Sequence, residues 1–203
     1  NLSLGFVPTM GALHKGHLSL IEKSKKECSF SVVSIFINPT QFAENEDLDS
    51  YPKTLDYDID CLNKLKVDIL FLPNENEMYK KVPDVNVPKS DLFVKLEGAS
   101  RPHFFFGVTQ IVAKLFNIIK PTHTFFGEKD AQQLIIIKEM IKKMKYPIKL
   151  IPGRTIRDKR GLALSSRNQY LTKCEKAEAS IFYSSLLNIV NLIEDGETNC
   201  EKL

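Results

Sequence analysis

Short, almost wholly apolar segments alternate along the chain with segments of helical periodicity. The five apolar segments are residues 2–7, 31–37, 68–72, 122–126 and 148–151. A strand that is apolar at successive positions is buried on both faces, which is typical of parallel sheets covered by helices. The alternation therefore predicts an α/β fold, with a Rossmann-like parallel sheet flanked by helices.

Between these strands, apolar residues recur every three or four positions, the spacing of one face of a helix. The predicted helices cover residues 17–28, 54–66, 108–119, 130–145 and 173–194. The polar, proline-containing stretch 74–100 predicts an irregular excursion with one short strand near 92–96. We expect a Rossmann-like domain over residues 1–155 and the start of a smaller α+β domain over residues 156–203.

Composition excludes several classes of protein. The formal net charge of +3 is small and the lysines are scattered, so neither nucleic acid nor a membrane surface is an expected partner. No apolar run approaches the roughly 20 residues that a membrane-spanning helix needs. The four cysteines are far apart and form no Cys-x-x-Cys pair, which favours free thiols in a reducing cytosol.

The segment from Pro8 to His17 joins the first predicted strand to the first helix, and it contains Gly11, His14 and Gly16. A helix start offers free N–H groups and the positive end of the helix dipole to an anion. Imidazoles add donors to phosphate oxygens. A His-x-x-His pair alone could also bind a metal, lie in the core or lie on the surface. No carboxylate or cysteine stands nearby at ligand spacing, which favours phosphate over metal.

Two more polar loops follow strand ends, and a further one lies between the two expected domains. Their polar residues are Asn38 and Gln41, then Lys129, Asp130 and Gln133, and finally Ser165, Ser166 and Arg167. Each loop alone also fits an ordinary Asn-Pro turn, a capped helix start or a basic surface loop. Because parallel sheets bind ligands beyond the carboxyl ends of their strands, we expect the loops to surround one site for phosphate and polyol groups.

These motifs, in this order, resemble those of the pantothenate synthetases, which belong to the wider His-x-Gly-His nucleotidyltransferases. The matching motifs are Pro8-Thr9-Met10-Gly11-Ala12-Leu13-His14-x-Gly16-His17, Asn38-Pro39-x-Gln41-Phe42, Tyr51-Pro52, Gly127-Glu128-Lys129-Asp130-x-Gln132-Gln133 and Ser165-Ser166-Arg167-Asn168. The resemblance implies an ATP-dependent ligase that condenses (R)-pantoate with β-alanine through a pantoyl adenylate, releasing AMP and pyrophosphate. It also implies Mg²⁺ with the ATP, small-molecule substrates only, and a cytoplasmic homodimer. Organellar targeting stays open.

The resemblance also implies roles for individual residues. The residues expected to be catalytic, at the triphosphate, are His14, His17, Lys129, Ser165, Ser166 and Arg167. Further ATP-binding residues are Pro8, Thr9, Met10, Gly127, Asp130, Ile156 and Leu164. The pantoate-binding residues are Met10, Asn38, Gln41 and Gln133. Tyr51 is expected near the reaction centre, and Asp58 matches a family position near the metal. Asp56 and Asp58 also fit the exposed face of a helix.

The sequence departs from the family pattern at several positions. Phe104 stands where the family has a histidine, and His103 lies one place earlier. The family also has a helix before the first strand and continues well past Leu203, so we expect this chain to be a fragment. Two alternatives stay open: a nucleotidyltransferase acting on a different acid or a phosphorylated acceptor, and a non-catalytic nucleotide-binding fragment. Gln41 and Gln133 speak against a phosphorylated acceptor, which would call for Arg or Lys.

Overall fold

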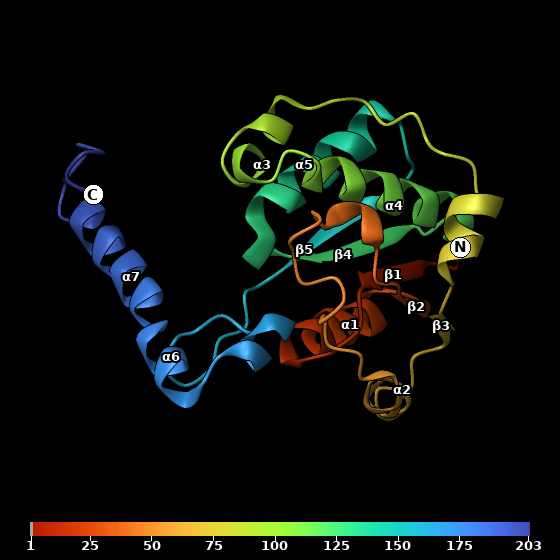
Figure 1. Cartoon of the computed structure of the whole chain (residues 1–203), viewed down its shortest axis with the longest axis horizontal. Coiled ribbons are helices and arrows are strands. Elements are labelled where there is room, and N and C mark those ends of the chain that lie inside the picture. Colours follow the sequence, from red (N-terminus) through yellow and green to blue (C-terminus); the bar gives the residue numbers. More distant parts are fainter. Residues whose placement is uncertain (1) are drawn as a thin grey trace.

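The computed structural model describes residues 2–203 and has a five-stranded parallel sheet at its centre (Figure 1). The strands are β1 (Leu4–Thr9), β2 (Phe30–Ile35), β3 (Ile69–Phe71), β4 (His123–Gly127) and β5 (Lys149–Gly153). Their order is β3-β2-β1-β4-β5. The strands after β1 are therefore added first on one side of it (β2 and β3) and then on the other side (β4 and β5). All five predicted strands and the Rossmann-like α/β class are confirmed.

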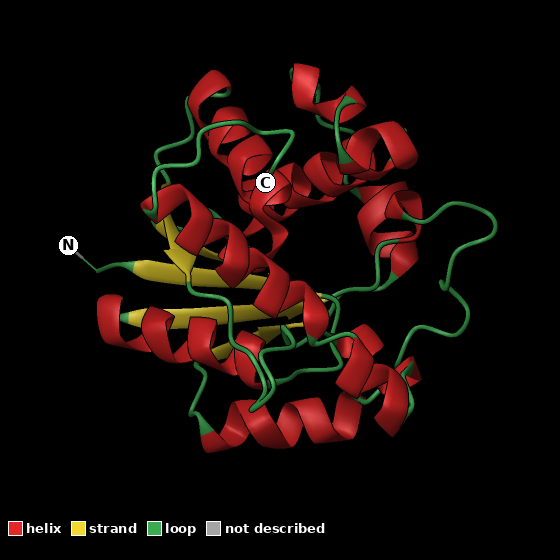
Figure 2. Cartoon of the chain, turned by 90° about the vertical axis from the view of Figure 1, so that its left-hand side faces the viewer, coloured by secondary structure: helices red, strands yellow, loops and turns green. Residues whose placement is uncertain are grey.

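Helices cover both faces of the sheet, as Figures 1 and 2 show. The four that pack on it are α1 (Lys15–Glu27), α2 (Leu55–Lys64), α4 (Phe104–Ile119) and α5 (Ala131–Lys143). Phe6 and Phe126 belong to the core under α4 and α5, whereas their neighbours Val7 and Phe125 belong to the core under α1 and α2. Successive side chains of a strand point to opposite faces, which explains why these strands are apolar throughout.

The strand predicted near residues 92–96 is wrong. The structure has two short helical turns there, η3 (Asp91–Val94) and α3 (Glu97–Ser100). The Ser90 side chain accepts a hydrogen bond from the Leu92 N–H, which starts the first turn. Gln132 Nε2 donates to the carbonyl oxygens of Leu92 and Lys95 at 2.8 and 2.7 Å. These backbone groups therefore bond to a side chain at the start of α5 and not to a neighbouring strand.

The prediction of a single helix over residues 173–194 is also wrong, because the structure has two helices there. They are α6 (Lys173–Glu178) and α7 (Ile181–Glu194). The Ser180 hydroxyl donates to the Ala177 carbonyl oxygen at 2.6 Å, and such side-chain bonds compete with the helical backbone ladder. In Figure 1, α7 projects away from the sheet. No helix in the described range 2–203 has both the length and the apolar content required to cross a membrane.

Candidate active site

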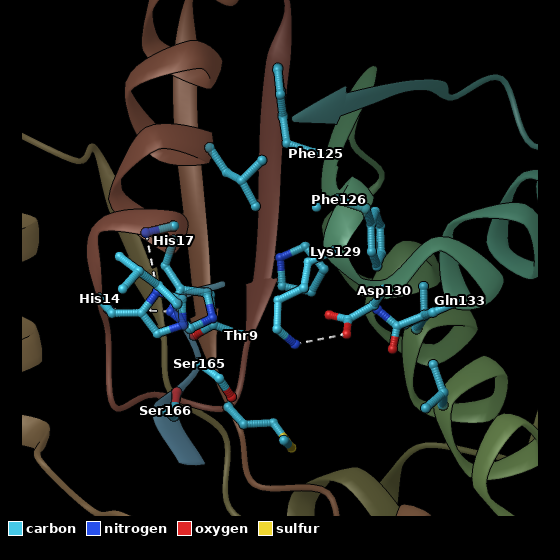
Figure 3. Close-up of a pocket in the computed structure, with 18 of the residues that line it drawn as sticks. Thr9, His14, His17, Phe125, Phe126, Lys129, Asp130, Gln133, Ser165 and Ser166 are labelled. Atoms are coloured by element: carbon cyan, nitrogen blue, oxygen red, sulfur yellow. Dashed lines mark hydrogen bonds and ion pairs between the residues drawn. The ribbon is translucent and has the colours of Figure 1, made fainter. Parts of the chain in front are cut away.

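A cavity of about 250 Å³ opens at the carboxyl ends of the strands, beside β1 and β4 (Figure 3). It is lined by Pro8, Thr9, Met10, His14, His17, Asn38, Gln41, Tyr51, Gly127, Lys129, Asp130, Gln133, Ile156, Leu164, Ser165, Ser166 and Arg167. The structure thus brings together every residue that the sequence placed in the site, with the exception of Asp58. The strand order switches sides between β1 and β4, and open α/β sheets bind ligands at such a topological switch point.

The turn between β1 and α1 is shaped by a carboxylate from α2. Gly11 and Ala12 both have left-handed backbone angles, with φ of 80° and 49°. Asp58 holds this turn, because its Oδ2 accepts from the Ala12 N–H at 2.9 Å and its Oδ1 from the Leu13 N–H at 2.8 Å. The Thr54 hydroxyl also donates to Asp58 Oδ1, at 3.2 Å. The carboxylate therefore fixes the backbone immediately before His14.

This arrangement corrects the expectation that Asp58 is exposed. The residue is 1% exposed, so the interpretation that it lies on the exposed face of α2 is wrong, although it holds for Asp56. Asp58 does not line the cavity, and both of its oxygens already accept backbone hydrogen bonds. The structure therefore supports a structural role for Asp58, and the metal-binding role stays a prediction.

The two histidines at the start of α1 are held as neutral hydrogen-bond donors. His14 Nδ1 accepts from the Gly16 N–H at 3.1 Å, and His17 Nδ1 accepts from the His14 N–H at 3.4 Å. With each Nδ1 accepting, the ring proton of each neutral imidazole lies on Nε2. Burial, followed by the charges of its neighbours, lowers the pKa of His17 to about 3, and burial with Lys129 also lowers the pKa of His14. Each ring can therefore offer one N–H to an anion.

The low pKa of His17 predicts a loss of folding stability in acid. The folded ring stays neutral down to about pH 3, because its pKa is lowered to about 3, whereas the ring in the unfolded chain takes up a proton near pH 6.5. The unfolded state binds more protons in this interval, so stability falls as the pH drops below about 6.5. Urea denaturation at about pH 7.5 and about pH 5 should show a larger loss for the wild type than for His17→Gln. Equal losses would contradict the assigned protonation state.

Lys129 and Asp130 form the wall opposite the histidines, whereas the hydroxyl groups of Ser165 and Ser166 lie on the histidine side. In Figure 3, Lys129 and Asp130 lie across from His14 and His17, and Lys129 Nζ is 3.1 Å from Asp130 Oδ1. The buried Ser166 donates its hydroxyl to the Ala12 carbonyl oxygen at 3.0 Å, although the two residues are 154 positions apart. This bond docks the serine-arginine loop onto the turn that Asp58 holds.

Arg167 has a partner that the sequence did not indicate. Its Nε and Nη2 donate to Asp47 Oδ2 and Oδ1 at 2.8 and 2.7 Å, and the Tyr170 hydroxyl donates to the same carboxylate at 2.9 Å. The Arg167 hydrogen bonds lower the pKa of Asp47. A bidentate pair of this kind orients the guanidinium at the cavity edge. The only signal in the sequence is the acidic run around Asp47, which no local pattern connects to a loop 120 residues away.

Amide groups line a different part of the wall. Asn38 is 1% exposed, and its Nδ2 donates to Gln41 Oε1 and to the Gly107 carbonyl oxygen, both at 3.2 Å. Gln41 Nε2 lies 3.0 Å from Met10 Sδ. A Cβ at Gly107 would lie 2.4 Å from the Thr40 carbonyl oxygen, so only glycine lets α4 approach this loop. The cavity thus has uncharged amide donors beside a thioether, opposite a wall built for an anion.

A family model described as pantoate-beta-alanine ligase matches the chain over residues 1–203. The chain belongs to the pantoate-beta-alanine ligase family. The pantothenate synthetase of Fervidobacterium nodosum is 47% identical to it over 201 residues, which is 99% of this chain and 72% of that relative. The family resemblance inferred from the motifs is confirmed.

Solved structures of this ligase family share the fold. The crystal structure of pantothenate synthetase from Thermus thermophilus superimposes with a TM-score of 0.92 and 41% identity, covering 96% of this chain and 71% of that one. The pantoate-beta-alanine ligase from Francisella tularensis, complexed with beta-gamma ATP and beta-alanine, gives a TM-score of 0.84 and 44% identity. That match covers 90% of this chain and 70% of the other.

The ligase cavity also contains residues that the sequence did not single out. The apolar ones include Phe36, Val108, Ile111, Val112 and Leu115, and the polar ones include Arg154 and Thr155. The apolar stripe of α4 was predicted as a helix, but such a stripe looks the same whether it packs in a core or lines a cavity.

Phe104, which replaces the family histidine, lines the cavity, and the Arg101 guanidinium lies 3.9 Å from its ring centroid. His103 is exposed and does not line the cavity. At this part of the wall the chain therefore has an aromatic ring, and His103 does not contribute an imidazole to the cavity.

Proposed function

We propose that this chain condenses pantoate with β-alanine at the expense of ATP, through a pantoyl adenylate. One observation supports this most directly. A single cavity contains both the groups that can bind phosphate and the amides of Gln41 and Gln133. The phosphate-binding groups are the two neutral histidines, Lys129 and the serine-arginine loop. The crystal structure of the Francisella tularensis relative is a complex with beta-gamma ATP and beta-alanine, which agrees with the proposed substrates.

In the first half-reaction, a pantoate carboxylate oxygen forms a bond to the α-phosphorus of ATP, and the bond to pyrophosphate breaks. Negative charge spreads over the phosphate oxygens in such transition states, so fixed hydrogen-bond donors stabilise them. We assign this role to the Nε2–H groups of His14 and His17, with Lys129, Ser165, Ser166 and Arg167. Neutral rings with low pKa values act as donors here and not as general bases.

In the second half-reaction, the β-alanine amine attacks the carbonyl carbon of the adenylate, and AMP departs. Positioning supplies much of the rate in such a step, since both reactants are held in one cavity. We propose that Gly127 and Asp130 hold the ribose, and that the backbone near Met10 and Ile156 borders the adenine. Pro8, Thr9 and Leu164 complete the nucleotide site.

The pantoate site consists of the Met10, Asn38, Gln41 and Gln133 side chains, with Tyr51 near the reaction centre. Tyr51 is 6% exposed, and this burial raises the pKa of its hydroxyl. Ser166 and Arg167 lie nearby and lower the same pKa by a smaller amount. We propose that its hydroxyl stays protonated and can donate a hydrogen bond at the carboxylate end of pantoate.

Mg²⁺ would enter with the nucleotide. Within residues 2–203, no three His, Cys, Asp or Glu side chains are grouped so that they could hold a metal ion. The residues therefore fit an ion held mainly by phosphate oxygens and water, which is common for Mg²⁺. When bound, it would neutralise charge on the triphosphate.

We also propose a cytoplasmic homodimer, with residues 1–155 as the sheet domain and 156–203 as part of a second domain.

Pyrophosphate release tests the proposal. Full-length protein incubated with ATP should release pyrophosphate only when pantoate is added, and should release AMP and form pantothenate when β-alanine follows. Release that ignores pantoate and responds to another acid would contradict the substrate. ATP binding by calorimetry with no dependence on pantoate, and no turnover, would favour a non-catalytic nucleotide-binding protein.

A further inference from the structure

Lys114 is a buried cation that the proposed chemistry does not use. It lies in α4 with 0% exposure, and its Nζ donates to the carbonyl oxygens of Met78 at 2.9 Å and Val82 at 3.1 Å. Asp84 Oδ1 lies 2.8 Å from the same nitrogen. A buried ammonium is stable only when its donors are satisfied. Lys114 therefore anchors the helical turn η2 (Glu77–Lys81) against the sheet domain.

The anchored turn contains Tyr79. Lys114 Nζ lies 4.6 Å from the centroid of the Tyr79 ring, and the ring packs on Phe36, which lines the cavity. The Tyr79 hydroxyl bonds to Asn38 Oδ1 and lies 3.1 Å from the Thr40 hydroxyl. Tyr79 itself does not line the cavity. Its hydroxyl therefore reaches the amide wall from behind.

Asn38 can adopt only one amide orientation in these surroundings. Its Nδ2 faces the Gly107 carbonyl oxygen at 3.2 Å, and a carbonyl can only accept. Oδ1 therefore faces the hydroxyls of Tyr79 and Thr40, the latter at 3.1 Å. The other N–H of Asn38 Nδ2 donates to Gln41 Oε1 at 3.2 Å. Because the Gln41 oxygen is engaged in this way, Gln41 Nε2 points to the Met10 side of the cavity.

We infer that Tyr79 is a positioning residue for the acid substrate. It fixes the Asn38 amide, which in turn makes Gln41 present N–H donors, and not its oxygen, to an acceptor oxygen of pantoate. The inference rests on the proposed function for the identity of the acid. The hydrogen bonds of this network reach none of the residues assigned to the triphosphate, and its link to the nucleotide site is the Met10 thioether, whereas the Met10 backbone is the part assigned to the adenine. The network should therefore govern affinity for the acid and leave affinity for ATP nearly unchanged.

Steady-state kinetics of Tyr79→Phe tests this inference. Losing one hydrogen bond in the network should raise KM for pantoate roughly tenfold, while KM for ATP stays within about twofold. The matched control is Tyr146→Phe, which loses a 2.9 Å bond to Asn117 away from the cavity and should leave both KM values unchanged. Thr40→Val removes the other hydroxyl donor to Asn38 and should also raise KM for pantoate, which keeps the test valid if Tyr79→Phe folds poorly.

Two results would overturn the inference. One is a KM for pantoate in Tyr79→Phe and Thr40→Val equal to that of the wild type. The other is an equal rise in both KM values, which would mean that Tyr79 supports the fold alone. A wild-type protein that does not use pantoate would instead contradict the proposed function, so the two failures are distinguishable.

Discussion

Replacing His17 by alanine is expected to lower the rate of pantoyl adenylate formation by at least about 100-fold. Removing one preorganised donor from the transition state of such a reaction typically costs a factor of about 10²–10³. The neutral His17 ring has its Nδ1 bonded to the His14 N–H, so its single remaining donor, Nε2–H, is the group that is lost. Single-turnover pyrophosphate release with saturating ATP and pantoate measures this rate.

The control for this variant is His103→Ala. His103 is exposed and outside the cavity, so its replacement should leave the rate within about twofold of the wild type, as exposed substitutions usually do. His17→Ala also removes a capping acceptor from α1, so its thermal unfolding must be compared with the wild type. A folded His17→Ala protein with a near-normal rate would remove His17 from the mechanism.

Replacing Asp58 by alanine is expected to destabilise the protein and to abolish most activity. The change leaves the buried N–H groups of Ala12 and Leu13 without acceptors, and each such group costs about 1–3 kcal/mol. The two together lower the free energy of unfolding by about 2–6 kcal/mol, on the order of a third of a typical domain's stability. The turn that precedes His14 would then lose its fixed shape, and urea denaturation measures the loss.

Asp56→Ala provides the matched control, because Asp56 is exposed on the same helix and its loss should change stability by less than about 0.5 kcal/mol. A metal-binding role for Asp58 makes the opposite prediction. It requires Asp58→Ala to be as stable as the wild type while needing much more Mg²⁺ for activity. That result would support the metal assignment and contradict the structural one.

The sheet could be predicted from the sequence because strands that are buried on both faces are apolar at successive positions. Each strand boundary lies within two residues of its predicted place. The two wrong elements have a common cause. Gln132 and Ser180 redirect the backbone through side-chain hydrogen bonds, and neither bond changes the hydrophobic pattern around it.

In the candidate site, too, some residues could be predicted from the sequence and others could not. The loops that contain His14, Gln41, Lys129 and Ser165 were recognisable because each follows a strand or a glycine in the sequence. The residues that position them were not recognisable as such: Asp47 and Tyr79 were not singled out, and Asp58 was singled out only for a role near the metal. Asp47, Asp58 and Tyr79 act across separations of 120, 46 or 45, and 41 residues, and each looks locally like an ordinary surface or helix residue.

The transfer of a labelled oxygen tests the central proposal most directly. Pantoate labelled with oxygen-18 in its carboxylate is incubated with ATP, β-alanine and the full-length protein, and the AMP is examined by mass spectrometry. Attack of the carboxylate on the α-phosphorus beside His14 and His17 predicts AMP that contains one labelled oxygen. Unlabelled AMP, or label found in inorganic phosphate alongside ADP, would contradict the adenylate and the roles assigned to this cavity.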